Sequence, residues 1–250
     1  MSVWELALIG VAAVMGGAVN ALAGGGTLIT FPTLTAVGVP AVAANITNTV
    51  ALCPGYLGGT FAQIDDLRGR RRLWPLGAVS IAGGIAGGIL LLLTGEHTFR
   101  RLVPFLILFA SVLLGVQEHV RKWMLRRSGQ SGEMESEALS VIAVGIASVY
   151  GGYFGAGLGV ITMAVLGLAL QDTVTRLNAI KQFIALFANV AAAGFFLFSG
   201  KVVWPAAVVM MIGALAGGSL GGRVAGRIEP VLLRRIVVVA GLVIAGIYFF

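Results

Sequence analysis

Ionisable side chains are scarce in this chain of 250 residues. Only 11% of the residues are charged, whereas 58% are hydrophobic. Soluble domains carry about 25% charged residues, so the composition excludes an ordinary water-soluble protein. From Leu6 to Ile64 the sequence contains no Asp, Glu, Lys, Arg or His. A helix that crosses a bilayer needs about 20 apolar residues, so this stretch alone is long enough for two crossings.

Cysteine and histidine are also rare. The single cysteine, Cys53, excludes an internal disulfide and is expected to be a small buried residue rather than a nucleophile. His97 and His119 lie far apart and lack the spacing of a metal site. Asp65 and Asp66 precede a run of arginines and are expected in a solvated turn. We therefore expect no enzyme activity, no cofactor and no metal. A membrane enzyme is the rival hypothesis.

The long apolar runs predict an all-α integral membrane protein with about eight transmembrane helices, four in each of two homologous halves. A β-barrel would instead show alternating segments of about 10 residues. The expected spans are residues 4–22, 43–64, 74–94, 101–119, 138–158, 176–198, 202–222 and 232–250. The expected domains are a first membrane repeat (1–120), a hydrophilic linker (121–137) and a second membrane repeat (138–250).

The two halves share motifs in the same order, and this duplication is the basis for expecting a repeat. Spaced glycines inside the runs are expected to let helices pack closely. Duplicated hydrophobic halves are typical of transporters, whose substrate site lies where the halves meet. The shared positions are Trp74, Pro75, Gly83, Gly87, Gly88 and Arg100 in the first half, and Trp204, Pro205, Gly213, Gly217, Gly218 and Arg234 in the second.

Glycines interrupt the apolar sequence after the first expected span of each half. Each glycine costs a helix interior about 1 kcal/mol relative to alanine, so a broken or re-entrant segment is expected at both places. Interrupted segments at corresponding positions of two halves indicate a substrate site. The site residues expected at the breaks are Asn20, Gly24, Gly25, Gly26, Thr27, Gly155, Gly157 and Gly159.

A polar stripe follows the second long helix of each half. Its residues share one helix face, because the spacing is the same in both copies and fits the helical period. Unpaired polar groups are costly in hydrocarbon, so the stripes should face each other, a cavity or the breaks. Hydrogen bonding between helices is the alternative. The site residues expected here are Asn45, Asn48 and Thr49 in the first half, and Asn178, Lys181, Gln182 and Asn189 in the second; Tyr56 and Cys53 lie on the first stripe.

Lys181 indicates the sign of the substrate's charge. An ionisable residue within a span is a functional hypothesis by default, although it can also extend its ammonium group to the interface. Helix N-termini at the glycine breaks would add partial positive charge and N–H donors. No acidic residue falls in a predicted membrane interior, which disfavours a cation site. The sequence therefore predicts a small anionic substrate.

Basic residues give only a weak indication of orientation. Residues 68–72 and 121–127 are arginine-rich and would be cytoplasmic if the N-terminus is inside. That choice places Arg100, Arg234 and Arg235 on the opposite side or at the interface. The net charge of +7 thus suits a lipid bilayer partner and not nucleic acid. Parallel and inverted repeats both stay open, and so does a homodimer.

Three segments, Ala23–Pro32, Ala43–Leu52 and Asn178–Asn189, resemble the TauE/SafE family of membrane transporters, which is linked to export of sulfite and small organosulfonates. The resemblance implies a multi-pass secondary transporter in a bacterial plasma membrane that exports a small anion by alternating access. An anion channel and a structural subunit are the alternatives. Ala156 and Leu158 interrupt a glycine cluster of the family, so the second break is expected to be less open than the first.

Overall fold

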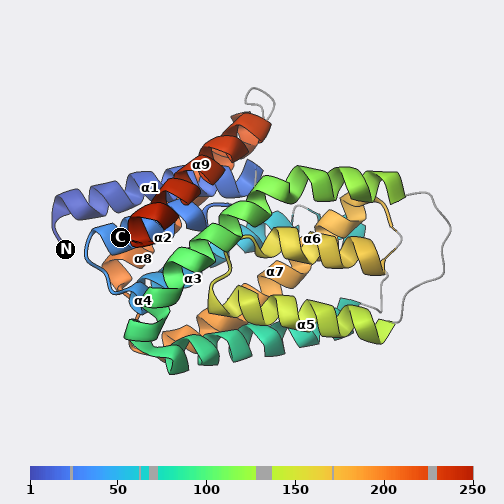
Figure 1. The fold of residues 1–250 in the computed structure, drawn as a ribbon, viewed down its shortest axis with the longest axis horizontal. Helices are drawn as coiled ribbons and strands as arrows, with labels where there is room; N and C mark the ends of the chain where they lie inside the picture. Colours follow the sequence, from blue (N-terminus) through green and yellow to red (C-terminus); the bar gives the residue numbers. More distant parts are fainter. Residues whose placement is uncertain are drawn as a thin grey trace.

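The computed structural model describes residues 1–22, 25–61, 63–67, 73–127, 137–170, 172–224 and 230–249. Over these residues the expected all-α fold is confirmed (Figure 1). The elements are α1 (Val3–Leu22), α2 (Thr27–Ala36), α3 (Ala41–Phe61), η1 (Ile64–Leu67), α4 (Leu73–Arg127), α5 (Glu137–Tyr153), α6 (Leu158–Ala169), α7 (Val174–Leu197), α8 (Trp204–Val224) and α9 (Pro230–Phe249). Three stretches of these helices are long and apolar enough to cross a membrane, namely Val3–Asn20, Leu73–Trp123 and Val174–Leu197.

Helix α4 contains a sharp bend and is in effect two helices. Gly95 has φ 70° and ψ 167°, a backbone conformation that a residue with a Cβ rarely adopts. The two parts correspond to the expected spans 74–94 and 101–119. The second part continues to Arg127, into the segment expected as a linker. The rest of that segment, residues 128–136, lies outside the described residues.

Contacts define one end of the bundle, which we call the Gly95 end. Directly after the bend, the carboxylate of Glu96 accepts hydrogen bonds from the backbone N–H groups of Ala41 (2.5 Å) and Val42 (3.0 Å). A carboxylate at a helix N-terminus is electrostatically favourable, so Glu96 fixes where α3 begins. The Val203 N–H donates to Thr47 Oγ1 at 3.0 Å, which places the α7–α8 connection at this end.

The opposite end, which we call the Glu118 end, gathers different termini. Arg234, near the start of α9, forms an ion pair with Glu118 near the end of α4, at 3.1 Å. Thr60, near the end of α3, donates to the backbone oxygen of Gln182 near the start of α7, at 3.2 Å. Helix α3 therefore runs from the Gly95 end to the Glu118 end, and α7 runs in the opposite direction.

Two short helices return the chain between longer ones. Helix α1 runs parallel to α8, with Gly10 beside Val209 and Gly17 beside Ala214, so α1 and α3 both start at the Gly95 end. The chain must return between them, and α2 makes that return. Helix α6 does the same between α5 and α7. A count of membrane crossings based only on long apolar runs misses these two short helices.

This omission explains an error in the expected orientation. With the N-terminus inside, Arg234 and Arg235 were expected on the opposite side of the membrane from Arg121 or at the interface. Instead, Arg234 contacts Glu118, three residues before Arg121 on the same helix. The expectation was wrong because a short apolar helix changes the direction of the chain without producing a run long enough to be counted as a crossing.

Close glycine packing joins the first part of the chain to the second. A Cβ added at Gly217 of α8 would lie 1.9 Å from the Val14 carbonyl oxygen of α1. One added at Gly87 of α4 would lie 2.1 Å from the Val149 oxygen of α5. Backbones can approach this closely only where side chains are absent. The spaced glycines therefore have the packing role that the sequence predicts.

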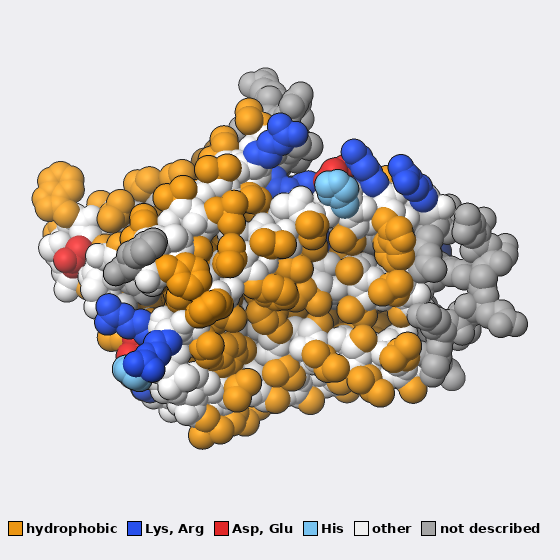
Figure 2. All heavy atoms as spheres, viewed as in Figure 1, with side chains coloured by type: hydrophobic (Ala, Val, Ile, Leu, Met, Phe, Trp, Pro, Cys, Tyr) orange, Lys and Arg blue, Asp and Glu red, His pale blue; other side chains and the backbone are white. Residues whose placement is uncertain are grey.

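The outer surface of the bundle is apolar. Ile146, Ile212 and Ile247 are 68%, 66% and 68% exposed. Figure 2 shows hydrophobic side chains over the middle of one face, with Lys and Arg gathered at its upper edge and its lower left corner. An apolar band between two charged borders is the surface that a protein presents to the hydrocarbon core of a bilayer.

Candidate functional site

A cavity of about 860 Å³ lies between the helices toward the Glu118 end. Its wall carries three cationic side chains, Arg121, Lys181 and Arg234, and an exposed threonine, Thr175. Amide side chains make up much of the remaining polar wall: Asn20, Gln63, Gln117, Asn178 and Gln182. None of the described residues that line the cavity is an aspartate or glutamate. The chemistry of this wall suits an anion.

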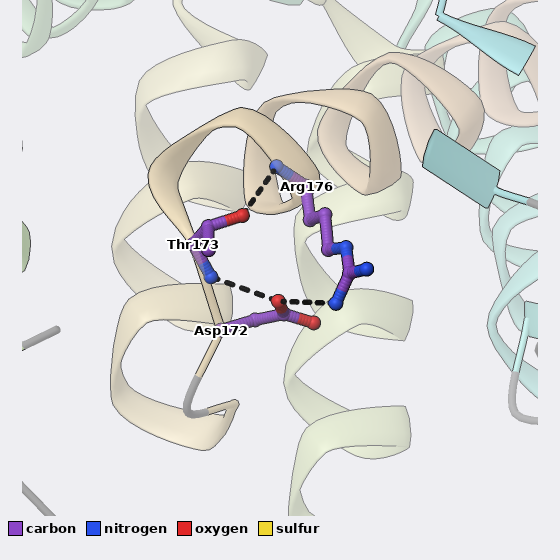
Figure 3. Close-up of polar contacts among 3 residues, drawn as sticks. All are labelled: Asp172, Thr173 and Arg176. Atoms are coloured by element: carbon purple, nitrogen blue, oxygen red, sulfur yellow. Dashed lines mark hydrogen bonds and ion pairs between the residues drawn. The ribbon is translucent and has the colours of Figure 1, made fainter. Parts of the chain in front are cut away.

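The start of α7 is fixed by a cap formed by Asp172, Thr173 and Arg176 (Figure 3). Thr173 Oγ1 accepts from the Arg176 N–H at 3.3 Å, and Asp172 Oδ1 accepts from the Thr173 N–H at 2.8 Å. Asp172 also lies 3.6 Å from Arg176 Nη1. A capping hydroxyl satisfies one of the N–H groups that a helix leaves unpaired at its N-terminus. With α7 beginning at Val174, one helix face presents Asn178, Lys181 and Gln182 to the cavity.

Lys181 is held at the cavity wall by a short chain of polar side chains. Its Nζ donates to Asn178 Oδ1 at 2.6 Å, and Asn178 Nδ2 donates to Gln63 Oε1 at 2.8 Å. Its alkyl chain passes Gly159 of α6, where an added Cβ would lie 3.6 Å from Lys181 Cδ. The amide oxygen orients the ammonium group without neutralising it, because the contact is not an ion pair. A fixed positive charge therefore remains available to a ligand.

The second glycine break, between α5 and α6, borders this cavity. Gly155 and Gly157 both have φ 78°, which ends α5 at Tyr153 and lets α6 start at Leu158. Irregular backbone at membrane depth must find polar partners inside the protein. Here the Tyr150 hydroxyl donates to the Ala156 oxygen at 2.6 Å, and Asn45 Nδ2 donates to the Tyr153 oxygen at 2.8 Å.

The described glycines of the first break, Gly25 and Gly26, are closely packed. Gly25, Gly26 and Thr27 are all buried, and a Cβ added at Gly26 would lie 2.4 Å from the Gly16 oxygen of α1. Asn48 of α3 accepts from Thr30 Oγ1 at 2.5 Å and donates to Thr27 Oγ1 at 3.3 Å. These three side chains join α3 to α2 directly beside the break.

Comparison with known proteins also indicates a membrane transporter, and the match covers nearly the whole chain. Residues 8–249 match the model of the family described as sulfite exporter TauE/SafE. The chain belongs to this family. It is 26% identical over 250 residues to the probable membrane transporter protein ORF9 of Sinorhizobium sp, covering 96% of this chain and 90% of that one.

Two further relatives carry names of the same kind. The probable membrane transporter protein YfcA of Escherichia coli K12 is 23% identical over 240 residues, with 94% of this chain and 86% of that one covered. A probable membrane transporter protein of Haemophilus influenzae is 27% identical over 230 residues, with 88% and 85% covered. These names and the family indicate a membrane transporter rather than an enzyme.

This TauE/SafE member brings only part of the predicted site together. Of the expected residues, Asn20, Gly155, Gly159, Asn178, Lys181 and Gln182 line the cavity. The remaining described ones lie elsewhere in the bundle: Gly25, Gly26, Thr27, Asn45, Asn48, Thr49, Gly157 and Asn189. Several of these bond to the backbone, as Thr49 does to the Asn45 oxygen (2.9 Å) and Asn189 to the Ala185 oxygen (2.8 Å). Gly24 lies outside the described residues.

Gly155 and Gly159 of the second break line the cavity, whereas Gly25 and Gly26 of the first do not, so among the described residues the second break is not the less open one. Ala156 is 2% exposed and packs in the core, while Gly155 beside it lines the cavity. Sequence reasoning also missed the cavity positions of Gln63, Gln117 and Arg234. Arg234 belongs to the repeated arginine pair, which indicated the internal repeat and the orientation but not the site. The two glutamines carry no sequence signal, because their positions depend on helix directions.

Proposed function

We propose that this protein is a secondary transporter that carries a small anion, such as sulfite, a sulfonate or a related organic anion, out of a bacterial cell by alternating access. The proposal rests chiefly on one observation, the cavity whose wall combines Lys181, Arg121 and Arg234 with several amides and no carboxylate. Ionisable residues inside a membrane bundle commonly mark a substrate pathway. The family description, sulfite exporter, agrees with the negative charge expected of the substrate.

Helix directions support two inverted repeats, each with four crossing helices and one short helix. The first repeat runs from α1 to the end of α4, with α2 as its short helix, and its α1 and α3 start at the Gly95 end. The second repeat runs from α5 to α9, with α6 as its short helix, and its α5 and α7 start at the Glu118 end. Inverted repeats related by an axis in the membrane plane are common in transporters, and broken segments lie at their substrate sites.

The distribution of basic residues supports a cytoplasmic Glu118 end. Described cations at that end include Arg121, Lys122, Arg126, Arg176 and Arg235. The Gly95 end has Arg100, Arg101 and Lys201. Cytoplasmic loops carry an excess of Lys and Arg. The N-terminus would then lie outside, contrary to the weak indication from sequence, and the cavity would load its anion from the cytoplasm.

The membrane potential is the favoured driving force. An inside-negative potential supplies about 2.3 kcal/mol per exported charge per 100 mV. None of the described residues lining the cavity is Asp, Glu or His, so none offers an obvious proton relay. Flux at a clamped potential, measured with and without a pH gradient, tests this choice: flux that follows only the pH gradient contradicts it.

Counterflow in proteoliposomes tests the transport proposal. We expect saturable uptake of labelled sulfite or methanesulfonate into vesicles preloaded with the unlabelled anion. Lys181→Gln should lower this flux about 100-fold or more, because it removes the fixed charge at the cavity wall. Lys122→Gln is the matched control, since Lys122 is exposed at the same end and does not line the cavity.

The counterflow assay also separates a carrier from a channel. A channel could use the same cavity, and it would show flux that rises linearly with concentration without counterflow. Equal flux in wild type and Lys181→Gln would remove the cavity from the transport path.

A further inference from the structure

Arg234 has more hydrogen-bonding capacity than its ion pair uses. The residue is 8% exposed and lines the cavity. Its Nη1 donates to Glu118 Oε2 at 3.1 Å. Its Nε is buried and has no hydrogen-bond partner among the described residues. A buried donor without an acceptor destabilises the protein, so this position suits a ligand that supplies an oxygen.

A structural role for Arg234 accounts for only part of this arrangement. The ion pair joins α9 to α4 and explains the contact of Nη1. It explains neither the buried Nε nor the place of the guanidinium in the cavity wall. Guanidinium presents five N–H donors in a planar fork that matches the oxygens of carboxylates and other oxyanions. One carboxylate oxygen of Glu118 leaves most of that fork available.

Glu118 differs from Arg234 in its surroundings. Its side chain is 28% exposed, and it does not line the cavity. Its negative charge stabilises the buried guanidinium when no ligand is bound. The same charge repels a second anion that approaches the guanidinium from the cavity side, because like charges this close destabilise each other even near the surface.

We infer that Arg234 is a second substrate-binding residue, in addition to Lys181, and that the charge of Glu118 competes with the bound anion for its guanidinium. The inference rests on the proposed function and extends it. The anion's oxygen accepts from the guanidinium of Arg234 in the cavity wall, while Glu118 Oε2 holds Nη1. Affinity for the anion is thus set by two residues on helices α4 and α9 that sequence reasoning did not place at the site.

Three matched variants test the inference by calorimetric titration of the purified full-length protein with sulfite and with methanesulfonate. Arg234→Gln should weaken binding at least about tenfold, because it removes a charge-assisted hydrogen bond. Glu118→Gln keeps an oxygen acceptor for Nη1 but removes the competing charge, and should tighten binding about threefold. Arg235→Gln, at the exposed neighbouring residue, should leave the Kd unchanged.

The opposite signs of the two effects distinguish binding from helix anchoring. If Arg234 only anchors α9, both variants lower the melting temperature and leave the Kd at its wild-type value, which overturns the inference. If Arg234→Gln does not fold, Glu118→Gln decides alone: a tighter Kd supports the inference and an unchanged or weaker Kd overturns it.

The two proposals fail in different ways. Weaker binding in Lys181→Gln with an unchanged Kd in Arg234→Gln would overturn the role of Arg234 alone. A wild-type protein that binds neither anion would overturn both the transport proposal and this inference.

Discussion

The two glycine breaks of this transporter are similar in sequence and different in structure. Each follows a long helix and precedes a short one. In the first, Gly26 packs against the backbone of Gly16, and Asn48 bonds to two threonine hydroxyls. In the second, Gly155 and Gly159 face a cavity beside Lys181. The described part of the first break is thus closely packed, and the second break borders the candidate site.

The difference follows from the side chain on the neighbouring long helix. Asn48 and Lys181 occupy the same position in the two polar stripes. An amide is satisfied by Thr27 and Thr30, so the helices beside it can close completely. An ammonium group is costly to bury without a counter-charge, and the nearby partner of Lys181 is the neutral Asn178. Space for water or an anion therefore accompanies the second break.

The threonines of the two short helices show the same contrast. Thr30 donates to Asn48, whereas the hydroxyl of Thr162, on α6, is fully buried and has no hydrogen-bond partner among the described residues. The hydroxyl on the first short helix is thus paired with α3, and the one on the second short helix is buried without a described partner.

The largest expected contrast is between alanine substitutions at the two breaks. Gly26→Ala places a methyl group 2.4 Å from the Gly16 carbonyl oxygen, so two backbones must separate. We expect a loss of at least about 3 kcal/mol of stability, or no folded protein. Gly159→Ala meets only the flexible side chain of Lys181, with Cδ at 3.6 Å and Cε at 4.0 Å, and should change stability by less than about 1 kcal/mol. Thermal unfolding in detergent measures both, and equal losses would contradict the contrast.

Substitutions in the two polar stripes should have different effects: one should lower the stability of the protein and the other its affinity for the anion. Asn48→Ala removes a buried amide and leaves two threonine hydroxyls without their partner, which should cost about 1–3 kcal/mol. Asn178→Ala removes the oxygen that orients Lys181 from a half-buried site, and should mainly weaken anion binding, about three- to tenfold. Melting temperatures and anion titrations of both variants decide this. Weakened binding without destabilisation in Asn48→Ala would move the site to the first break.

A third contrast, which changes neither stability nor affinity, concerns access of water to the two regions. In a Cys53→Ser background, Ser219→Cys lies in the cavity wall and Thr27→Cys lies in the buried first break. A membrane-impermeant maleimide should label Ser219→Cys at least about tenfold faster in inside-out vesicles, because only an accessible thiolate reacts. Faster labelling of Ser219→Cys in right-side-out vesicles would reverse the proposed orientation. Equal labelling of both thiols would contradict the closed first break.

Several parts of the fold are predictable because they depend on local sequence. The long helices follow from runs of apolar residues, and the end of α5 follows from glycines that adopt a positive φ. Lys181 stands out because a charge inside an apolar helix is unusual. Its neighbours Asn178 and Gln182 follow from helical spacing alone. These predictions need only the period of the helix and the cost of burying charge.

Other features depend on where distant segments meet. The partners of Arg234 and Asn178, namely Glu118 and Gln63, are more than 100 residues away in sequence, so no local pattern identifies them. The direction of α3 and α7 depends on the short helices α2 and α6, which are too brief to count as crossings. The sequence by itself determined an apolar helical chain with two breaks and one intramembrane lysine. Only tertiary packing decided which break closes and which borders a cavity, because that outcome depends on how closely each pair of helices can approach.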